Sequence, residues 1–442
     1  MPKIPQIRVE PPGPNAREII KVDEKYMATS TKTSPIAVES ASGSVVHDVD
    51  GNVYLDFASG VGVLNIGHCH PKVVKAVRDQ AEKVMHFAGT DFYNDLQSRL
   101  VKKLSEICPG KYDKRVFLSN SGTEAIEAAM KVARWHTQRK QFISFIGAFH
   151  GRTMGSLSLT ASKPVQRNRF FPLVPGEVHI PFAYCYRCPY HLEYPSCGIW
   201  CAKILEEVYF ESFLPAEEVA ALFIEPVQGE GGYVVPPAEF VEIMSRTCKK
   251  HGILLVDDEV QAGMGRTGKL WGIENFGIVP DVLCAAKALG SGVPIGATVY
   301  HRKLDFGVQG AHSNTFGGNL LACASALATI DVIEKEKVLG MAAKTGKHLR
   351  KRLDDLMEKH DIIGDVRGLG MMQATELVED RKTKKPAKKA RDKVVELCYK
   401  RGVILIPCGK STIRYIPPLT TPVEYIDAGV EVVDSALRDA VK

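Results

Sequence analysis

The sequence predicts an α/β protein built on a mainly parallel sheet, because apolar runs alternate with amphipathic or alanine-rich stretches between about residues 115 and 287. The apolar parts are continuous rather than alternating, as expected for strands covered on both faces. Ligands bind beyond the carboxyl ends of parallel strands, so we expect the polar ends of these runs to form one site. The five runs are 115–124 (RVFLSNSGTE), 142–151 (FISFIGAFHG), 221–232 (ALFIEPVQGEGG), 253–261 (ILLVDDEVQ) and 282–292 (VLCAAKALGSG).

The length of 442 residues suits a large domain and a smaller one. After about residue 331 the pattern changes to a long charged helix over 331–360, followed by short strands around 365–377 and 413–419. This part reads as a smaller α/β domain. The expected division is an N-terminal segment that packs with the small domain, a large domain and a small C-terminal domain: 1–74, 75–330 and 331–442.

Composition argues against membrane insertion and nucleic-acid binding. Hydrophobic residues make up 45% of the chain and no window contains 18 uninterrupted apolar residues. The net charge of +6 owes much to the run from Arg381 to Lys393, which lacks interleaved aromatics and is expected to be a solvated loop. The N-terminus lacks the apolar core of a secretory signal, so we expect a cytoplasmic protein.

Four of the eleven cysteines cluster in a C-x2-C-x8-C-x3-C arrangement: Cys185, Cys188, Cys197 and Cys201. The cluster is compatible with free thiols in a surface insertion, with disulfides or with a bound metal. The other seven are scattered, which suits a reducing compartment. No catalytic role and no metal at the catalytic site are expected.

A helix is predicted to begin after Ser121, because Ser121 and Glu124 fit a capping box and an apolar stripe follows. The chain enters this helix through Gly122 and Thr123. Free backbone N–H groups at such a helix N-terminus can bind a phosphate, although many capped helices bind nothing.

Lys287 ends an apolar run and is followed by small residues and glycines. Desolvation in a crevice lowers the pKa of a lysine and frees the nucleophilic amine that Schiff-base chemistry requires. The alternative is a lysine at a strand end whose ammonium reaches solvent.

Three consecutive acids end the run before it. Strand alternation directs Asp257 and Glu259 to one face and Asp258 to the other, with Gln261 a little beyond. A buried carboxylate needs a cation or a strong donor. For Asp258 that partner is either Lys287 or a protonated ring nitrogen on a cofactor. A phosphate cradle, an amine and a buried acid together match the needs of pyridoxal phosphate.

The sequence closely resembles the class III, or omega, aminotransferases of pyridoxal-phosphate fold type I, and among them the 4-aminobutyrate aminotransferase branch. The resemblance covers nearly the whole chain and implies a large domain with a mainly parallel sheet, a smaller α/β domain and the cofactor pyridoxal 5'-phosphate. The matched blocks are DVDGNVYLDFASGVGVLNIGHCHP, NSGTEA, GAFHGRT, EPVQGEGGY, DDEVQAGMGRTG, the strand ending at Lys287, NTFGGN and IRYIPPL.

The resemblance assigns cofactor roles to matched residues. Lys287 resembles the Schiff-base lysine that also moves the proton, Asp258 the partner of the pyridine nitrogen, and Gln261 the donor to the ring hydroxyl. Gly122 and Thr123 match the phosphate-binding turn.

Three further residues complete the cofactor site that the resemblance implies. Phe149 should stack on the ring, with His150 beside it. Thr315 resembles a threonine that reaches the phosphate of the neighbouring subunit. That match implies a homodimer with shared active sites, and a larger oligomer stays open.

The substrate residues implied by the resemblance are two arginines, two acids and a pocket residue. Arg152 would clamp the distal carboxylate of 4-aminobutyrate, and Arg414 the α-carboxylate of glutamate. Glu230 would neutralise Arg414 when an ω-amino acid is bound. Glu225 resembles an acid behind the site or a contact to the amino end, and Val61 a residue lining the pocket.

The resemblance implies transfer of the amino group of 4-aminobutyrate or a similar ω-amino acid to 2-oxoglutarate, giving a semialdehyde and glutamate. An ornithine or acetylornithine aminotransferase and an amino-acid racemase of the same family are alternatives. Asp257 departs from the family pattern, which often has a small apolar residue there, so we expect it to face away from the cofactor with a partner of its own.

Overall fold

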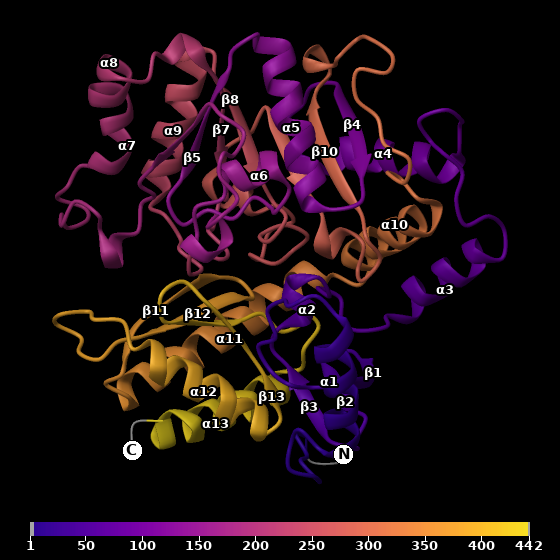
Figure 1. Cartoon of the computed structure of the whole chain (residues 1–442), viewed down its shortest axis with the longest axis vertical. Helices are drawn as coiled ribbons and strands as arrows, with labels where there is room; N and C mark the ends of the chain where they lie inside the picture. Colours follow the sequence, from indigo (N-terminus) through magenta and orange to yellow (C-terminus); the bar gives the residue numbers. More distant parts are fainter. Residues whose placement is uncertain (1–3, 441–442) are drawn as a thin grey trace. The chain divides into compact units, whose positions relative to one another are not determined.

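The computed structural model describes residues 4–440, and the chain forms two compact units. Residues 72–332 form one unit, and residues 1–71 with 333–442 form the other (Figure 1). The divisions expected after residues 74 and 330 fall close to these. No helix among residues 4–440 is both long and apolar enough to span a bilayer.

The unit of residues 72–332 is built on a seven-stranded sheet in the order β4-β10-β9-β8-β7-β5-β6. Neighbouring strands are parallel except at β10, which runs antiparallel to β9 and to β4. The predicted α/β class with a mainly parallel sheet is confirmed. The strands are β4 (Lys114–Ser119), β5 (Gln141–Phe145), β6 (Glu177–Ile180), β7 (Val219–Ile224), β8 (Leu254–Asp258), β9 (Val282–Ala285) and β10 (Gly296–His301).

The carboxyl ends of six strands therefore lie along one edge of this sheet, together with the start of β10. The five runs singled out in the sequence contain β4, β5, β7, β8 and β9. Both β6 and β10 lie outside these runs. β6 has only four residues, and its polar Glu177 and His179 interrupt the apolar pattern.

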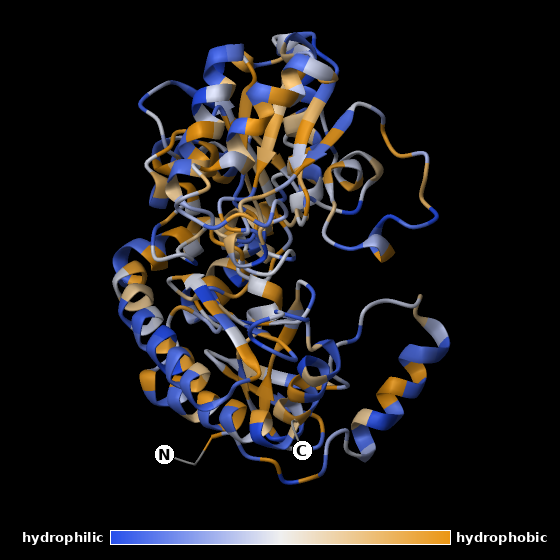
Figure 2. Ribbon diagram, turned by 90° about the vertical axis from the view of Figure 1, so that its left-hand side faces the viewer, coloured by the Kyte–Doolittle hydropathy of each residue, from blue (hydrophilic) through white to orange (hydrophobic). Residues whose placement is uncertain are grey.

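Helices pack against the sheet, and α5 contacts β4, β7, β8, β9 and β10. The core between them is apolar and includes an edge-to-face pair of Phe142 and Phe223 with ring centroids 5.5 Å apart. Figure 2 shows apolar residues concentrated along the strands and mixed with polar residues along the helices. The helices are α3 (Pro71–Ala81), α4 (Asp95–Ile107), α5 (Gly122–Thr137), α6 (Met154–Leu159), α7 (Trp200–Ile204), α8 (Phe210–Ser212), α9 (Ala238–His251) and α10 (Leu320–Lys335).

The other unit contains two four-stranded sheets, β1-β2-β3-β13 and β11-β12-β15-β14. β13 pairs in parallel with β3, so the C-terminal part of the chain completes the N-terminal sheet. The elements are α1 (Pro14–Tyr26), β1 (Val38–Ser42), β2 (Val45–Asp48), β3 (Val53–Asp56), α2 (Ser59–Gly62), α11 (Val338–Lys359), β11 (Ile363–Leu369), β12 (Met372–Leu377), α12 (Lys388–Lys400), β13 (Val403–Ile404), β14 (Ile406–Cys408), β15 (Thr412–Tyr415) and α13 (Val423–Ala440).

Two local expectations were wrong. The long charged helix pattern forms two helices, α10 and α11, separated at Lys337, whose backbone is left-handed with φ +54°. The basic run is not a loop throughout, because α12 begins at Lys388. Its first residue, Arg381, donates to carbonyl oxygens at the end of α11 and just beyond it, so that side chain has a structural role.

Candidate active site

Lys287 lies just past the end of β9, where the backbone enters a short 3-10 turn, Lys287–Leu289. Its φ of +45° is left-handed, a conformation that costs a non-glycine residue on the order of 1 kcal/mol. Its ammonium Nζ donates to Gln261 Oε1 at 2.7 Å. The amine is thus held in one position by a neutral side-chain amide.

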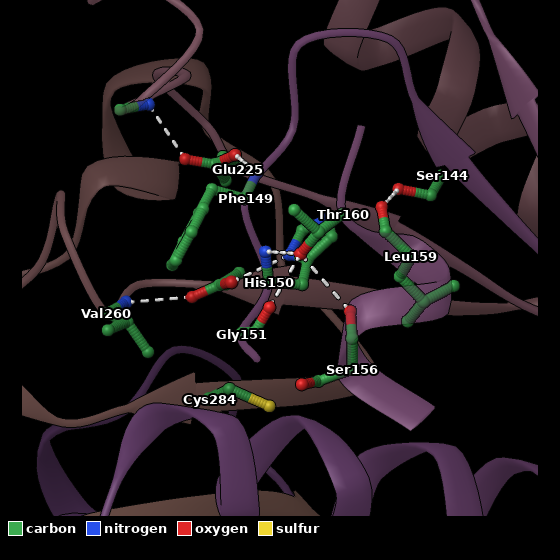
Figure 3. A network of polar contacts seen from close by, with 12 residues as sticks. Ser144, Phe149, His150, Gly151, Ser156, Leu159, Thr160, Glu225, Val260 and Cys284 are labelled. Carbon is green, nitrogen blue, oxygen red and sulfur yellow. Dashed lines mark hydrogen bonds and ion pairs between the residues drawn. The ribbon is translucent and has the colours of Figure 1, made fainter. Parts of the chain in front are cut away.

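Asp258 is the last residue of β8 and is 3% exposed. Its Oδ2 is 2.7 Å from His150 Nδ1, and its Oδ1 accepts from the backbone N–H of Val260 at 3.0 Å (Figure 3). Burial lowers the pKa of His150, but the hydrogen bond and charge of Asp258 outweigh burial and raise it. Asp258 therefore favours the charged form of His150.

The two acids beside Asp258 differ in their surroundings, and the expectation that Asp257 has a hydrogen-bond partner of its own was wrong. Glu259 accepts from the N–H groups of Gly272 at 2.8 Å and Ile273 at 2.7 Å. Burial raises the pKa of Glu259 to about 7. Burial, with the charge of Glu259, raises the pKa of Asp257 well above its ordinary value. Within residues 4–440, both carboxyl oxygens of Asp257 are buried without a hydrogen-bond partner.

The N-terminus of α5 is built as a tight turn. Ser121 Oγ accepts from the N–H of Glu124 at 3.4 Å, while Glu124 Oε2 accepts from the N–H of Asn120 at 2.9 Å. The carboxylate therefore closes the capping arrangement one residue earlier than a standard capping box. A Cβ at Gly122 would come within 2.9 Å of Val260 Cγ1, so the turn approaches the loop that follows Asp258.

The hydroxyl of Thr123 is engaged with the loop that carries Arg152. It lies 2.8 Å from Thr153 Oγ1 and 2.5 Å from Ser156 Oγ, and it accepts from the N–H of Arg152 at 3.2 Å. Glu127 extends this cluster by accepting from Thr153 Oγ1 at 2.6 Å. These contacts connect the predicted phosphate turn to the predicted substrate arginine.

Phe149 and Glu225 are joined through the backbone. The N–H of Phe149 donates to Glu225 Oε1 at 2.8 Å, and the N–H of Gly229 donates to Oε2 at 2.7 Å (Figure 3). Burial raises the pKa of Glu225 to about 7. The guanidinium of Arg152 lies 5.5 Å from the centroid of the Phe149 ring, within cation–π range.

Glu230 forms an ion pair with Lys163, a residue that the motifs did not point to. Both side chains are partly buried, with 18% of Glu230 and 33% of Lys163 exposed. Only the fold shows this pair, because the two residues lie 67 positions apart in different loops.

Three further predicted site residues are carried by other elements. Arg414, on β15, is buried and donates through Nη2 to the carbonyl of Pro407 at 3.0 Å. Val61 is 45% exposed and has a left-handed φ of +69° within α2. Thr315 is exposed in the loop before α10. Arg414 and Val61 belong to the unit of residues 1–71 and 333–442, and Thr315 to the other.

The four clustered cysteines are free thiols that line one small cavity. Burial, helped by the neighbouring thiols, raises the pKa of Cys201 to about 12. Across residues 4–440, no group of three or more His, Cys, Asp or Glu side chains is arranged to hold a metal ion. The described geometry thus corresponds to the free-thiol interpretation.

The residues at the sheet edge fit pyridoxal phosphate. Lys287 supplies a primary amine, and Asp258 supplies a buried carboxylate for a protonated ring nitrogen. The N-terminus of α5 supplies backbone donors, and a Cβ at Gly151 would come within 2.3 Å of Thr123 Oγ1, so the chain there has no room for a side chain. An amine, an acid and an anion cradle are the three groups that this cofactor requires.

Comparisons with known proteins agree with this geometry. Residues 26–437 match the family model for class III aminotransferases. Similar curated proteins are the isoleucine 2-epimerase of Lentilactobacillus buchneri, 37% identical over 95% of this chain and 94% of its own, and the 5-aminovalerate aminotransferase DavT of Pseudomonas aeruginosa, 39% identical over 90% and 92%. A third is the probable 4-aminobutyrate aminotransferase of Bacillus subtilis, 35% identical over 90% and 91%.

A solved structure extends the likeness to the whole fold. An amine transaminase from an uncultivated Pseudomonas species, in its PLP-bound form, superposes with a TM-score of 0.87 at 31% identity, covering 94% of this chain and 98% of its own. The family match, the fold and the residues at the sheet edge lead to one conclusion: this chain belongs to the class III aminotransferases, which depend on pyridoxal phosphate.

Proposed function

We propose that this protein transfers the amino group of 4-aminobutyrate or a similar ω-amino acid to 2-oxoglutarate, giving a semialdehyde and glutamate. The observation that carries the pyridoxal-phosphate chemistry of this proposal is the placement of Lys287 and Asp258 at the ends of the adjacent parallel strands β9 and β8, each held by its own partner. The likeness to two curated aminotransferases of ω-amino acids supports the substrate class.

When bound, pyridoxal phosphate supplies an electron sink that stabilises negative charge on the substrate carbon. Lys287 would hold the cofactor covalently through its amine, and once the amino substrate had displaced it, the freed amine would move the proton from the substrate carbon to the cofactor. Asp258, oriented by His150, keeps the ring nitrogen protonated. Gly122 and Thr123 anchor the phosphate through backbone N–H groups, because the Thr123 hydroxyl already serves the loop of Arg152.

Substrate choice rests on the two arginines. Arg152 takes the distal carboxylate of an ω-amino acid, and Arg414 takes the α-carboxylate of glutamate. Glu230 neutralises Arg414 when no α-carboxylate is present, and its ion pair with Lys163 offers it a second cation when it is displaced. Val61 lines the pocket, and Glu225 supports the loop of Phe149.

A second candidate function is amino-acid racemisation, which the 37% identity to an isoleucine 2-epimerase favours. A racemase removes the proton from the carbon that bears the amino group and returns a proton to the opposite face of that carbon. It then releases the amino acid, and no oxo acid is consumed. The cofactor residues Lys287 and Asp258 serve both reactions, so they do not discriminate between them.

We also propose that the protein is cytoplasmic. We propose a homodimer, because Thr315 matches a residue that serves the neighbouring subunit in the family. Its partners are then a small-molecule amino donor and an oxo-acid acceptor. Size-exclusion chromatography with light scattering tests the assembly, and a monomeric holoenzyme would contradict it.

The deciding experiment is an amino-donor screen of the purified protein with pyridoxal phosphate and 2-oxoglutarate, scored for glutamate. The donors are 4-aminobutyrate, 5-aminovalerate, ornithine and acetylornithine. A parallel set offers L-amino acids without any oxo acid and measures the D-enantiomer. Glutamate formed from an ω-amino acid supports the proposal, whereas D-enantiomer without glutamate replaces it with the racemase.

A further inference from the structure

We propose that Tyr233 is a positioning residue that holds the side-chain amide of Gln261 against Lys287. Tyr233 is completely buried, and its hydroxyl lies 3.1 Å from Gln261 Nε2. The other end of the same amide, Oε1, accepts from Lys287 Nζ at 2.7 Å. The inference rests on the proposed function in one respect, which is that Lys287 is the reactive amine.

The protonation of Lys287 decides which way the amide points. An ammonium has three donors and no acceptor, so the atom of Gln261 that faces it must be the oxygen. The amide nitrogen then points away from Lys287 and needs an acceptor of its own. The Tyr233 hydroxyl oxygen is that acceptor, since a phenol can accept as well as donate.

The backbone around Tyr233 is arranged to keep its hydroxyl in place. Tyr233 has a left-handed φ of +55°, which a bulky residue adopts only when its surroundings enforce it. A bridge between Gln228 and Val234, with a hydrogen bond in each direction, closes the turn on both sides. A Cβ at Gly229 would lie 3.1 Å from Gln261 Cγ, so this turn also packs directly on Gln261.

Lys287, which contacts the other end of the Gln261 amide, also has a left-handed backbone, with φ +45°. Two strained residues therefore face each other across one amide. Without the hydroxyl, a buried amide nitrogen would lose its acceptor, and the amide would rotate towards other partners. Lys287 Nζ would then lose the oxygen that holds it in place to meet the cofactor.

The test uses Tyr233→Phe, which removes the hydroxyl and keeps the ring. Apoprotein is mixed with pyridoxal phosphate, and covalent capture by Lys287 is followed by the visible absorbance band. We expect capture to be slowed about fivefold, the cost of one buried hydrogen bond, while kcat falls and the KM for the amino donor stays within about twofold. An unchanged capture rate would overturn the proposal.

A double-mutant cycle separates positioning from a general structural effect. If Tyr233 acts through Gln261, then Tyr233→Phe should slow capture by less than about twofold in a Gln261→Met background. An equal effect in both backgrounds would show that Tyr233 acts by another route, and the proposal would fail. Should Tyr233→Phe not fold, as judged by circular dichroism, Tyr233→Met removes the same hydroxyl with a different side chain.

Tyr300→Phe is the matched control. Tyr300 is a buried tyrosine of the same unit, and its hydroxyl donates to Asp305 Oδ1 at 3.2 Å. The Tyr300→Phe variant should capture the cofactor at the wild-type rate. If it is slowed as much as Tyr233→Phe, a specific role for Tyr233 is refuted. Capture is scored separately from amino transfer. A wild type that captures the cofactor but makes no glutamate contradicts the proposed function, while the effect of Tyr233→Phe on capture still decides this inference.

Discussion

At the scale of single residues, Asp258 is a buried acid that specific partners hold. The residue is 3% exposed, and its carboxylate is met by a histidine and a backbone N–H. Its neighbour Glu259 accepts from the backbone N–H groups of residues 272 and 273, whereas both carboxyl oxygens of Asp257 are buried without a hydrogen-bond partner in the described part of the chain. Three consecutive acids thus have separate environments.

The first prediction compares these neighbours. Asp258→Asn should lower kcat by about 100-fold, because the ring nitrogen loses the charge that keeps it protonated. Asp257→Asn is the matched control, since it removes a carboxyl from the opposite face of the same strand and should leave kcat within about twofold. Steady-state amino transfer is the measurement. Similar losses of kcat in both variants would contradict the assignment of the cofactor role to Asp258 alone.

The second prediction concerns Lys163. Lys163→Met removes the ion pair with Glu230. Under the proposed roles, Glu230 then competes more strongly with the α-carboxylate for Arg414. The KM for 2-oxoglutarate should rise about threefold, as expected for a partly exposed ion pair, with the KM for the ω-amino donor unchanged. Lys163→Arg keeps the charge and should behave as the wild type. Equal changes in both KM values would rule out a role in substrate choice.

At the scale of elements, β10 is one of two strands of the large sheet, with β6, that the sequence analysis missed, and it joins the phosphate turn after β4 to Lys287 after β9. Its first residues pair with Ser119 at the end of β4 and with Ala285 at the end of β9. Gly296 is required there, because a Cβ would lie 2.3 Å from the carbonyl oxygen of Ser121.

The third prediction follows from that close approach. Gly296→Ala should displace the turn before α5 and weaken cofactor binding about tenfold, mainly through the phosphate. Titration of apoprotein with pyridoxal phosphate gives the dissociation constant. Gly340→Ala is a control, because a Cβ there meets nothing within 4 Å. Equal binding in Gly296→Ala and wild type would show that the turn moves without consequence.

Sequence patterns predicted those structural features that depend on residues close together in the chain. Five strands, the cap at Ser121 and the alternation at Asp257 to Glu259 follow from burial and local geometry, so they could be read in advance. The pairing of Glu230 with Lys163 and of Gln261 with Tyr233 could not, because loops far apart in the chain meet only in the folded sheet. The break at Lys337 was missed because helical periodicity continues across it.

At the scale of the whole molecule, the buried acids make stability depend on pH. The pKa values of Glu225 and Glu259 are raised to about 7, mainly by burial, whereas unfolding returns both to about 4.3. A raised pKa contributes stability that is fully present below the unfolded value and is lost as pH rises through the folded value. Both groups therefore favour the folded state more at mildly acidic than at neutral pH.

The fourth prediction is that the free energy of unfolding of the apoprotein falls between about pH 5 and pH 7, with each group contributing up to about 1.4 kcal/mol per pH unit. Urea denaturation at several pH values measures the slope. Asp257→Asn should make the slope shallower, because it removes a third buried carboxyl group whose pKa is raised in the folded protein. An identical slope in the variant would contradict a raised pKa for Asp257.

The reversed direction of β10 has a consequence for how this architecture tolerates change. A single strand lies between β4 and β9, so the turn after β4 and Lys287 after β9 are set two strand spacings apart, about 10 Å. That separation is a property of the backbone ladder, independent of any side chain that touches the ligand. Substitutions can therefore change the side chains that line the pocket while the distance between Lys287 and the phosphate-binding turn after β4 stays constant.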